Sequence, residues 1–267
     1  MRALVVLVAL LLGTASSAHA APAEVFLEAM TWTEVRDALH AGSTTILIPV
    51  GGTEQSGPPM ALGKHNVRVK ALAGRIAAAL GNALVAPVLA YVPEGSIAPP
   101  TGHMRFAGTI SIPDATFQSV LDATARSFKQ HGFLDVVLIG DHGGYQPQLK
   151  AVAARLNHDW AGSPARAHFI EDYYRVTQTG YVQALRSHGL TDAQIGQHAG
   201  SADTSLMLAI DASLVRPDRM PKDAREAQAA GVSGDPRASS VALGQLGVDL
   251  VVARSVAAIR DAVGARR

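Results

Sequence analysis

Residues 46–65 read ILIPVGGTEQSGPPMALGKH, and the prediction of the fold starts from this stretch. Residues 46–50 are apolar and end at Gly51-Gly52, which predicts a short buried strand followed by a turn. Glu54 lies in the loop after that strand. In an open α/β sheet, ligands bind where the carboxyl ends of the strands open into loops. We therefore predict that Glu54 belongs to the functional site, although this loop by itself would also suit an ordinary turn with a solvated acid.

A second strand followed by a polar loop occurs later in the chain. Residues 136–145 read VVLIGDHGGY and place His142 after an apolar run, much as Glu54 follows the first run. A third polar segment, HAGSADTS at residues 198–205, leads into a helix predicted over residues 205–210. The three segments supply histidines and carboxylates from separate loops, which is the arrangement that a metal site needs.

Predicted helices and strands alternate along the whole chain. Apolar residues at helical spacing predict helices that include residues 32–41, 69–80, 114–128 and 248–263. Extended segments are predicted within residues 83–92, with a break at Pro87, and at 109–112, 135–139 and 165–170. The alternation predicts one α/β domain over residues 21–267, in which helices cover both faces of a mostly parallel sheet.

The first twenty residues have the features of a secretory signal peptide. Arg2 supplies a short basic region, residues 3–12 are apolar, and Ala18-His19-Ala20 has the form of an A-x-A cleavage site. The apolar run is shorter than the roughly 20 residues of a membrane-spanning helix. We expect an exported protein, periplasmic or secreted, with no further segment apolar and long enough to cross a membrane.

The composition favours a small-molecule substrate. The formal net charge is only +1 and no basic patch is present, so nucleic-acid binding is not expected. The chain contains no cysteine, which excludes a cysteine nucleophile, and it has no G-x-S-x-G motif of a serine hydrolase. The histidines and carboxylates in the three loops therefore remain as the candidates for chemistry.

Five segments, in order along the chain, resemble the creatininase family of metal-dependent amidohydrolases. They are GGTEQSGPPMALGKH at residues 51–65, HMRFAGT at 103–109, GDHGGY at 140–145, HAGSADTS at 198–205 and GDPRA at 234–238. The resemblance implies a creatininase-like three-layer fold and hydrolysis of a C–N bond in a small amide, cyclic amide or related compound. It also implies a homo-oligomer, which in the family is often a hexamer.

The resemblance places specific residues in a metal site. Glu54 and His142 match family ligands, whereas His65 replaces a bridging aspartate, Asp203 replaces a later glutamate, and Ser56 replaces a histidine of a second metal. A carboxylate can bridge two metals, but an imidazole normally binds one. We therefore predict one divalent metal per chain, zinc or alternatively manganese or iron, held by Glu54, His65 and His142. Asp203 is predicted as a fourth ligand or as the base for a metal-bound water.

Further residues are predicted to act on the substrate. His198 is predicted as the general acid or base for the leaving nitrogen. His103, Gly143, Gly144 and Tyr145 are predicted to bind substrate, because glycine without a side chain lets a ligand approach the backbone closely.

A second hypothesis is an exported small-molecule-binding protein that keeps the fold and has lost the metals. Ser56, Ser201 and His65 favour it, since each replaces a ligand of the family pattern. The retained Glu54, His142 and His198, together with the carboxylate of Asp203, oppose it. The catalytic hypothesis requires Glu54, His65 and His142 to converge on one point.

Overall fold

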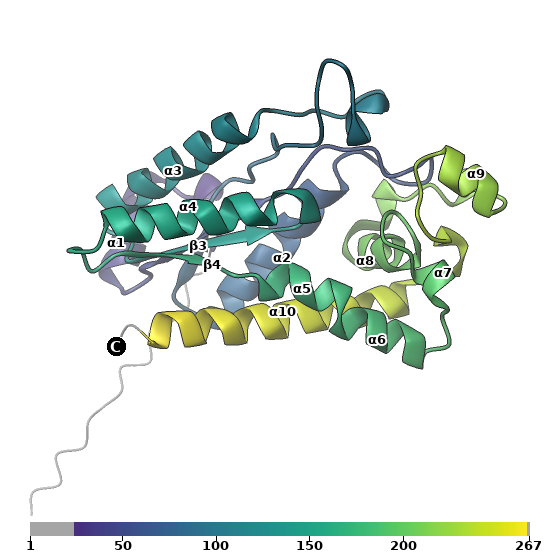
Figure 1. The fold of residues 1–267 in the computed structure, drawn as a ribbon. Coiled ribbons are helices and arrows are strands. Elements are labelled where there is room, and N and C mark those ends of the chain that lie inside the picture. Colours follow the sequence, from purple (N-terminus) through teal and green to yellow (C-terminus); the bar gives the residue numbers. More distant parts are fainter. Residues whose placement is uncertain (1–23, 266–267) are drawn as a thin grey trace, which may run out of the picture.

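The computed structural model describes residues 24–265 of the 267-residue chain (Figure 1). The predicted signal peptide lies outside the described residues. The described chain forms one sheet with helices on both sides, as the alternation of apolar segments predicts.

Four parallel strands form the sheet. They are β1 (Thr45–Val50), β2 (Ala83–Val85), β3 (Asp135–Gly140) and β4 (Arg166–Phe169), in the order β2-β1-β3-β4. The central strands β1 and β3 pair over their full lengths. The buried sheet and its parallel strands confirm the predicted fold class.

The extended segment predicted within residues 83–92, with a break at Pro87, forms the short strand β2 before that proline, which has no N–H to continue a ladder. The strand predicted at residues 109–112 is wrong. Ile110 and Ile112 donate backbone hydrogen bonds to two different segments, at Thr53 and Val92, so no ladder forms.

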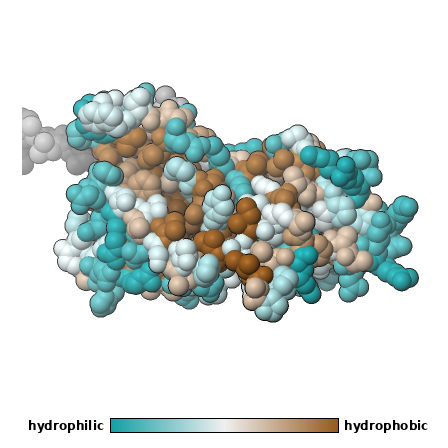
Figure 2. Space-filling view, turned by 90° about the horizontal axis from the view of Figure 1, so that it is seen from above, coloured by the Kyte–Doolittle hydropathy of each residue, from teal (hydrophilic) through white to brown (hydrophobic). Residues whose placement is uncertain are grey.

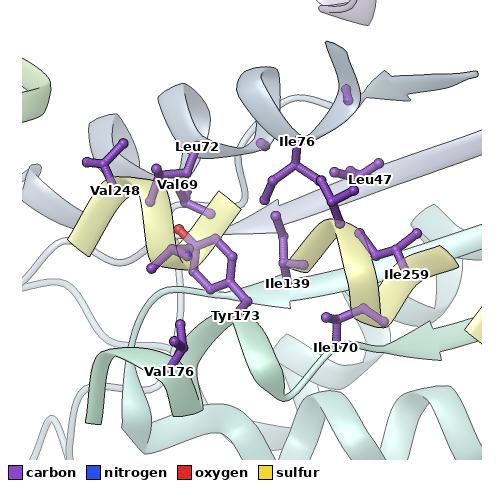
Figure 3. Close-up of a cluster of buried hydrophobic side chains, with 14 of the residues drawn as sticks. Leu47, Val69, Leu72, Ile76, Ile139, Ile170, Tyr173, Val176, Val248 and Ile259 are labelled. Carbon is purple, nitrogen blue, oxygen red and sulfur yellow. The ribbon is translucent and has the colours of Figure 1, made fainter. Parts of the chain in front are cut away.

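Alternating side chains of the sheet enter two separate cores. On one face, Leu47 and Ile139 pack against α2 (Lys64–Leu80), α5 (Asp172–Gln178) and α10 (Val241–Gly264), as Figure 3 shows. On the other face, Ile46 and Val136 pack against α1 (Trp32–His40), α3 (Asp114–Gln130) and α4 (Gln146–Asp159). The two-residue period of a strand thus produces the three layers.

The C-terminal helix α10 lies along the lower side of the molecule in Figure 1 and packs against α8 (Ser201–Asp211), α5 and α2. Its 24 residues and mean hydropathy of 1.5 are sufficient for a membrane span, contrary to the expectation that no such segment follows the leader. Val248, Val251 and Ile259 lie in the core. The apolar composition of α10 therefore matches its place as a core helix.

The remaining short helices are α6 (Gly180–Ser187), α7 (Asp192–Ile195) and α9 (Ala224–Ala229). Together with α8 they form the right-hand part of the molecule in Figure 1. A small apolar cluster that includes Met60, Met207 and Val232 joins this part to the loop after β1.

The strand order places the functional loops at one crevice. The chain passes from β1 to β2 on one side and continues from β2 to β3 on the opposite side of β1. Such a reversal is the point at which open α/β sheets bind ligands. The loops that carry Glu54 and His142 follow β1 and β3 at this point.

Candidate metal centre and active site

Glu54 is the central residue of the site. Its side chain is fully buried, and its two oxygens face different neighbours. Oε1 lies 2.8 Å from His65 Nε2 and 3.5 Å from Lys64 Nζ. Oε2 lies 3.1 Å from His103 Nε2 and 3.4 Å from His142 Nε2. One carboxylate thus connects two halves of the site.

The Oε2 half contains a group that could hold a metal ion, made of Glu54, Glu94, His103 and His142. One ligand atom from each residue lies within 4.8 Å of the other three. Within residues 24–265, Glu54 Oε2 and both oxygens of Glu94 are buried and make no hydrogen bond. A buried carboxylate oxygen without a partner is costly, and a cation would relieve that cost. Two carboxylates and two imidazoles are suitable ligands for a divalent transition metal.

A folded loop delivers two members of this group together. Glu94 and His103 both lie in the segment over residues 93–108, and the His103 backbone N–H donates to the Glu94 carbonyl at 3.2 Å. Ser111 Oγ accepts from the Glu94 N–H at 2.9 Å and donates to the Gly95 carbonyl at 2.7 Å. At Gly95, φ is +132°, and a Cβ would lie 2.3 Å from the Thr101 carbonyl oxygen. Glycine is therefore required for this closure.

Glu94 was missed by the sequence analysis. Glu94 is the only acidic residue in the Pro- and Gly-rich segment 93–108, and the same segment contains His103. The presence of both in one long loop could have pointed to Glu94 as a site residue. Burial and the neighbouring Glu54 carboxylate raise the pKa of Glu94 to about 9. Burial lowers the pKa of His142 to about 3, so this imidazole is neutral, as a metal ligand must be.

The raised pKa of Glu94 predicts how the metal-free protein responds to pH. Between pH 4.5 and about 9 the folded state binds a proton that the unfolded state has lost, so this group's contribution to stability falls as pH rises. We expect Glu94→Gln to abolish that component and to be more stable than the unmodified chain at pH 9. Urea unfolding of the chelator-treated proteins at pH 5, 7 and 9 measures the difference. The exposed Glu171→Gln is the control, and parallel stability curves for Glu94→Gln and the unmodified chain would contradict the prediction.

The Oε1 half is a buried network of charges. Asp141 Oδ2 accepts from His65 Nδ1 at 2.6 Å, and the Arg68 guanidinium lies 2.8 Å from the same oxygen. The Tyr173 hydroxyl donates to Asp141 Oδ1 at 2.8 Å. A carboxylate that accepts from one imidazole nitrogen orients the other nitrogen toward a ligand or metal. Here it directs His65 Nε2 to Glu54.

Asp203 occupies the far end of this network. Oδ2 lies 3.2 Å from Lys64 Nζ and accepts from the Ala199 N–H at 2.9 Å, while Oδ1 accepts from Arg68 at 2.9 Å. Burial alone would raise the pKa of Asp203, but Lys64 and Arg68 hold it well below its usual range. A carboxylate of such low basicity, with both oxygens engaged, serves as a partner for these two cations.

His198 presents an unprotonated nitrogen to the site. Its Nε2 donates to the Gln55 backbone carbonyl at 2.9 Å, which leaves Nδ1 as the nitrogen that faces Glu54 Oε1, at 3.7 Å. Burial lowers the pKa of His198 to about 4. The Gln55 side chain donates to the Gly231 carbonyl at 3.1 Å and fixes this strand-exit loop against the 231–233 turn. Gln55 was not singled out from the sequence.

The predicted substrate-binding residues divide into three kinds. Gly143 lines a cavity of about 110 Å³ whose walls also include Lys64, His142, His198 and Asp203. His103 lies in the metal-binding group instead. Tyr145 is fully buried, and its hydroxyl contacts the carbonyls of residues 50 and 51 and the amides of 141 and 142. It therefore joins the loops after β1 and β3, and with Gly144 it lies outside the cavity lining.

Glu54, His65 and His142 lie close together, but His65 Nε2 approaches Glu54 Oε1 whereas His142 Nε2 approaches Oε2. His65 also lies outside the four-residue group, so the convergence of all three on one point stays a prediction. The His65 and His142 ring centroids are 5.3 Å apart, and both imidazoles lie beside Glu54. Asp203 lies outside the four-residue group. Which of these side chains bind the metal remains a prediction. A buried cluster of carboxylates and imidazoles at the crevice of a parallel α/β sheet is the kind of site that a metal-dependent hydrolase uses.

Comparisons with known proteins agree. The family model described as "Creatininase: Creatinine amidohydrolase" matches residues 28–259. Creatinine amidohydrolase of Pseudomonas putida is 28% identical over 259 residues, which cover 89% of this chain and 96% of that protein. The mycofactocin precursor peptide peptidase of Mycolicibacterium smegmatis is 28% identical over 78% of this chain and 81% of its own.

Solved structures share the fold. A mutant creatininase of the zinc–zinc type has a TM-score of 0.74 and 27% identity, over 90% of this chain and 98% of its own. A manganese form of creatininase has a TM-score of 0.73, with 27% identity over 90% of this chain and 99% of its own. The chain belongs to the creatininase family.

Proposed function

We propose that this chain hydrolyses a C–N bond of a small amide or cyclic amide with one divalent metal ion per chain. The observation that carries the proposal is that Glu54 Oε2 and both oxygens of Glu94 are buried, make no hydrogen bond within residues 24–265, and lie beside the imidazoles of His103 and His142. A bound metal supplies a water of lowered pKa and polarises the scissile carbonyl. Zinc suits this mixed set best, and manganese or iron are alternatives.

The residues take separate roles in this proposal. Glu54, Glu94, His103 and His142 hold the metal, and His65 is oriented by Asp141 toward the shared carboxylate of Glu54. The unprotonated His198 Nδ1, at the cavity wall, would take up the proton that the attacking water loses and return it to the leaving nitrogen. Asp203 holds the charges of Lys64 and Arg68 in place.

The dimensions of the cavity favour a small substrate. Its volume of about 110 Å³ is well below the roughly 300–1,000 Å³ of pockets that enclose drug-sized ligands. Polar groups of Tyr174, Gln178 and Gln197 line it beside Val182 and Leu206. The small cavity supports a compact amide or lactam as the substrate. It does not favour a peptide, which is the substrate that the name of the mycobacterial relative gives for that protein.

Export and self-association complete the proposal. The leader-like residues 1–20 support a periplasmic or secreted location. Hydrophobic residues gather on the face of the molecule seen in Figure 2, and large hydrophobic side chains that are exposed include Trp32, Tyr91 and Ile97. Exposed apolar surface of this kind supports a homo-oligomer.

Metal content tests the function. We expect the protein, purified without chelator, to contain about one zinc, manganese or iron per chain, because the four-residue group offers ligands for one ion. Mass spectrometry of the metals measures this, and a panel of amides and lactams measures hydrolysis before and after chelation. Activity should be lost on chelation and regained with the metal. A protein that takes up no metal on reconstitution would instead be the small-molecule-binding member of the family.

A further inference from the structure

The Lys64 ammonium is a fixed cation inside the site. Its side chain is fully buried at the start of α2, and Nζ lies 3.5 Å from Glu54 Oε1 and 3.2 Å from Asp203 Oδ2. Burying an unpaired ammonium is costly, so these two carboxylates are what make this position tolerable. The Lys64 ammonium thus lies between two carboxylates, where a metal cation could also lie.

The surroundings of Nζ also resemble the surroundings of a metal. Besides Glu54 Oε1 and Asp203 Oδ2, the unprotonated His198 Nδ1 faces the same region, 3.7 Å from Glu54 Oε1. His65 Nε2 approaches that oxygen at 2.8 Å. Two carboxylates therefore contact the Lys64 ammonium, and two imidazoles face the Glu54 oxygen that it contacts. Glu94, His103 and His142 form the separate group with Glu54.

The remaining charge in this half of the site is that of Arg68. The Arg68 guanidinium pairs with Asp203 Oδ1 at 2.9 Å and with Asp141 Oδ2 at 2.8 Å, so its positive charge offsets the charge of these two carboxylates. Among residues 24–265, Arg68 forms no ion pair with Glu54. Lys64 alone therefore supplies the cation that bridges Glu54 and Asp203.

We propose that the Lys64 ammonium takes the place of a second metal ion and so restricts this chain to a single metal. Glu54 would then bridge a metal at Oε2 and an ammonium at Oε1. The zinc–zinc form of a related creatininase indicates that proteins of this fold can hold two metals. The inference rests on the proposed one-metal function and assigns a cause to the metal count.

Zinc stoichiometry of Lys64 variants tests this. The metal-free proteins are incubated with excess zinc chloride and desalted, and bound zinc per chain is measured. Lys64→Ala removes the ammonium and opens the space between the carboxylates, so we expect bound zinc to rise from one toward two per chain. Lys64→Arg retains the positive charge and should remain at one. Lys70→Ala, an exposed lysine of the same helix, is the control.

Lys64→Met is a second variant, which tests the role of the charge even if Lys64→Ala does not fold. It keeps the length of the side chain and removes only the charge, so the single zinc should bind about tenfold or more tightly as a nearby repulsive charge is lost. A variant that is merely loosened would bind zinc more weakly.

The outcomes separate this inference from the proposed function. One zinc in every variant, with unchanged affinity for Lys64→Met, would overturn the role of Lys64 and leave the one-metal hydrolase standing. Two zinc ions in the unmodified chain would overturn both the metal count and the role of Lys64. No zinc in the unmodified chain would overturn the proposed metal site itself.

Discussion

Replacing Glu54 with glutamine is expected to remove metal binding and reduce turnover about 10³-fold or more. Lewis-acid catalysis by a metal contributes several kcal/mol to the transition state, and each 1.36 kcal/mol is tenfold in rate. Glu54 contacts both halves of the site, so no other side chain can take over its position. Burial alone would raise its pKa, but Lys64 and His65 lower the pKa below its usual range, so the carboxylate is ionised and available to a cation.

The measurement is metal per chain, together with kcat on the amide that the unmodified protein hydrolyses fastest. Glu28→Gln is the matched control, because Glu28 is an exposed glutamate that pairs with the exposed Lys70. The control should keep its metal and its rate. If Glu54→Gln retained stoichiometric metal and a rate within about tenfold of the unmodified protein, the assignment of Glu54 as a ligand would be wrong.

Replacing Arg68 with methionine is expected to cost about 3–5 kcal/mol of the free energy of unfolding. Arg68 is buried and pairs with Asp141 and Asp203, so its removal leaves one buried and one half-buried carboxylate short of a partner. A loss of this size is a large part of the roughly 5–15 kcal/mol that stabilises a typical domain. Because Asp141 also orients His65, the loss should loosen the site as well as the fold.

Urea unfolding gives the free energy directly. Arg126→Met is the control, since Arg126 also pairs with two aspartates, Asp122 and Asp159, but on the surface of the protein. Exposed pairs contribute roughly 0–1 kcal/mol, so the two arginine variants should differ clearly. Equal losses of unfolding free energy in the two variants would show that burial does not determine how much these ion pairs stabilise the fold.

Much of the fold follows from local patterns in the sequence. The apolar run at residues 46–50 and the run at 136–139 both become buried parallel strands, because a strand covered on both faces is apolar throughout. Helical spacing correctly predicted α2, α3 and α10. The segment at 109–112 failed because two separate hydrogen bonds, which no local pattern reveals, satisfy its backbone in place of a ladder.

The sequence by itself determined the order of strands, helices and polar loops, and hence that Glu54 and His142 would lie together at one end of the sheet. The tertiary structure decided what surrounds them. Glu94 becomes part of the group only because the 93–108 loop closes on itself and turns the carboxylate inward. Lys64 meets Asp203 across 139 residues of chain. Such pairings depend on long-range packing and on the cost of burying charge, whereas strand and helix patterns arise from neighbours in the sequence.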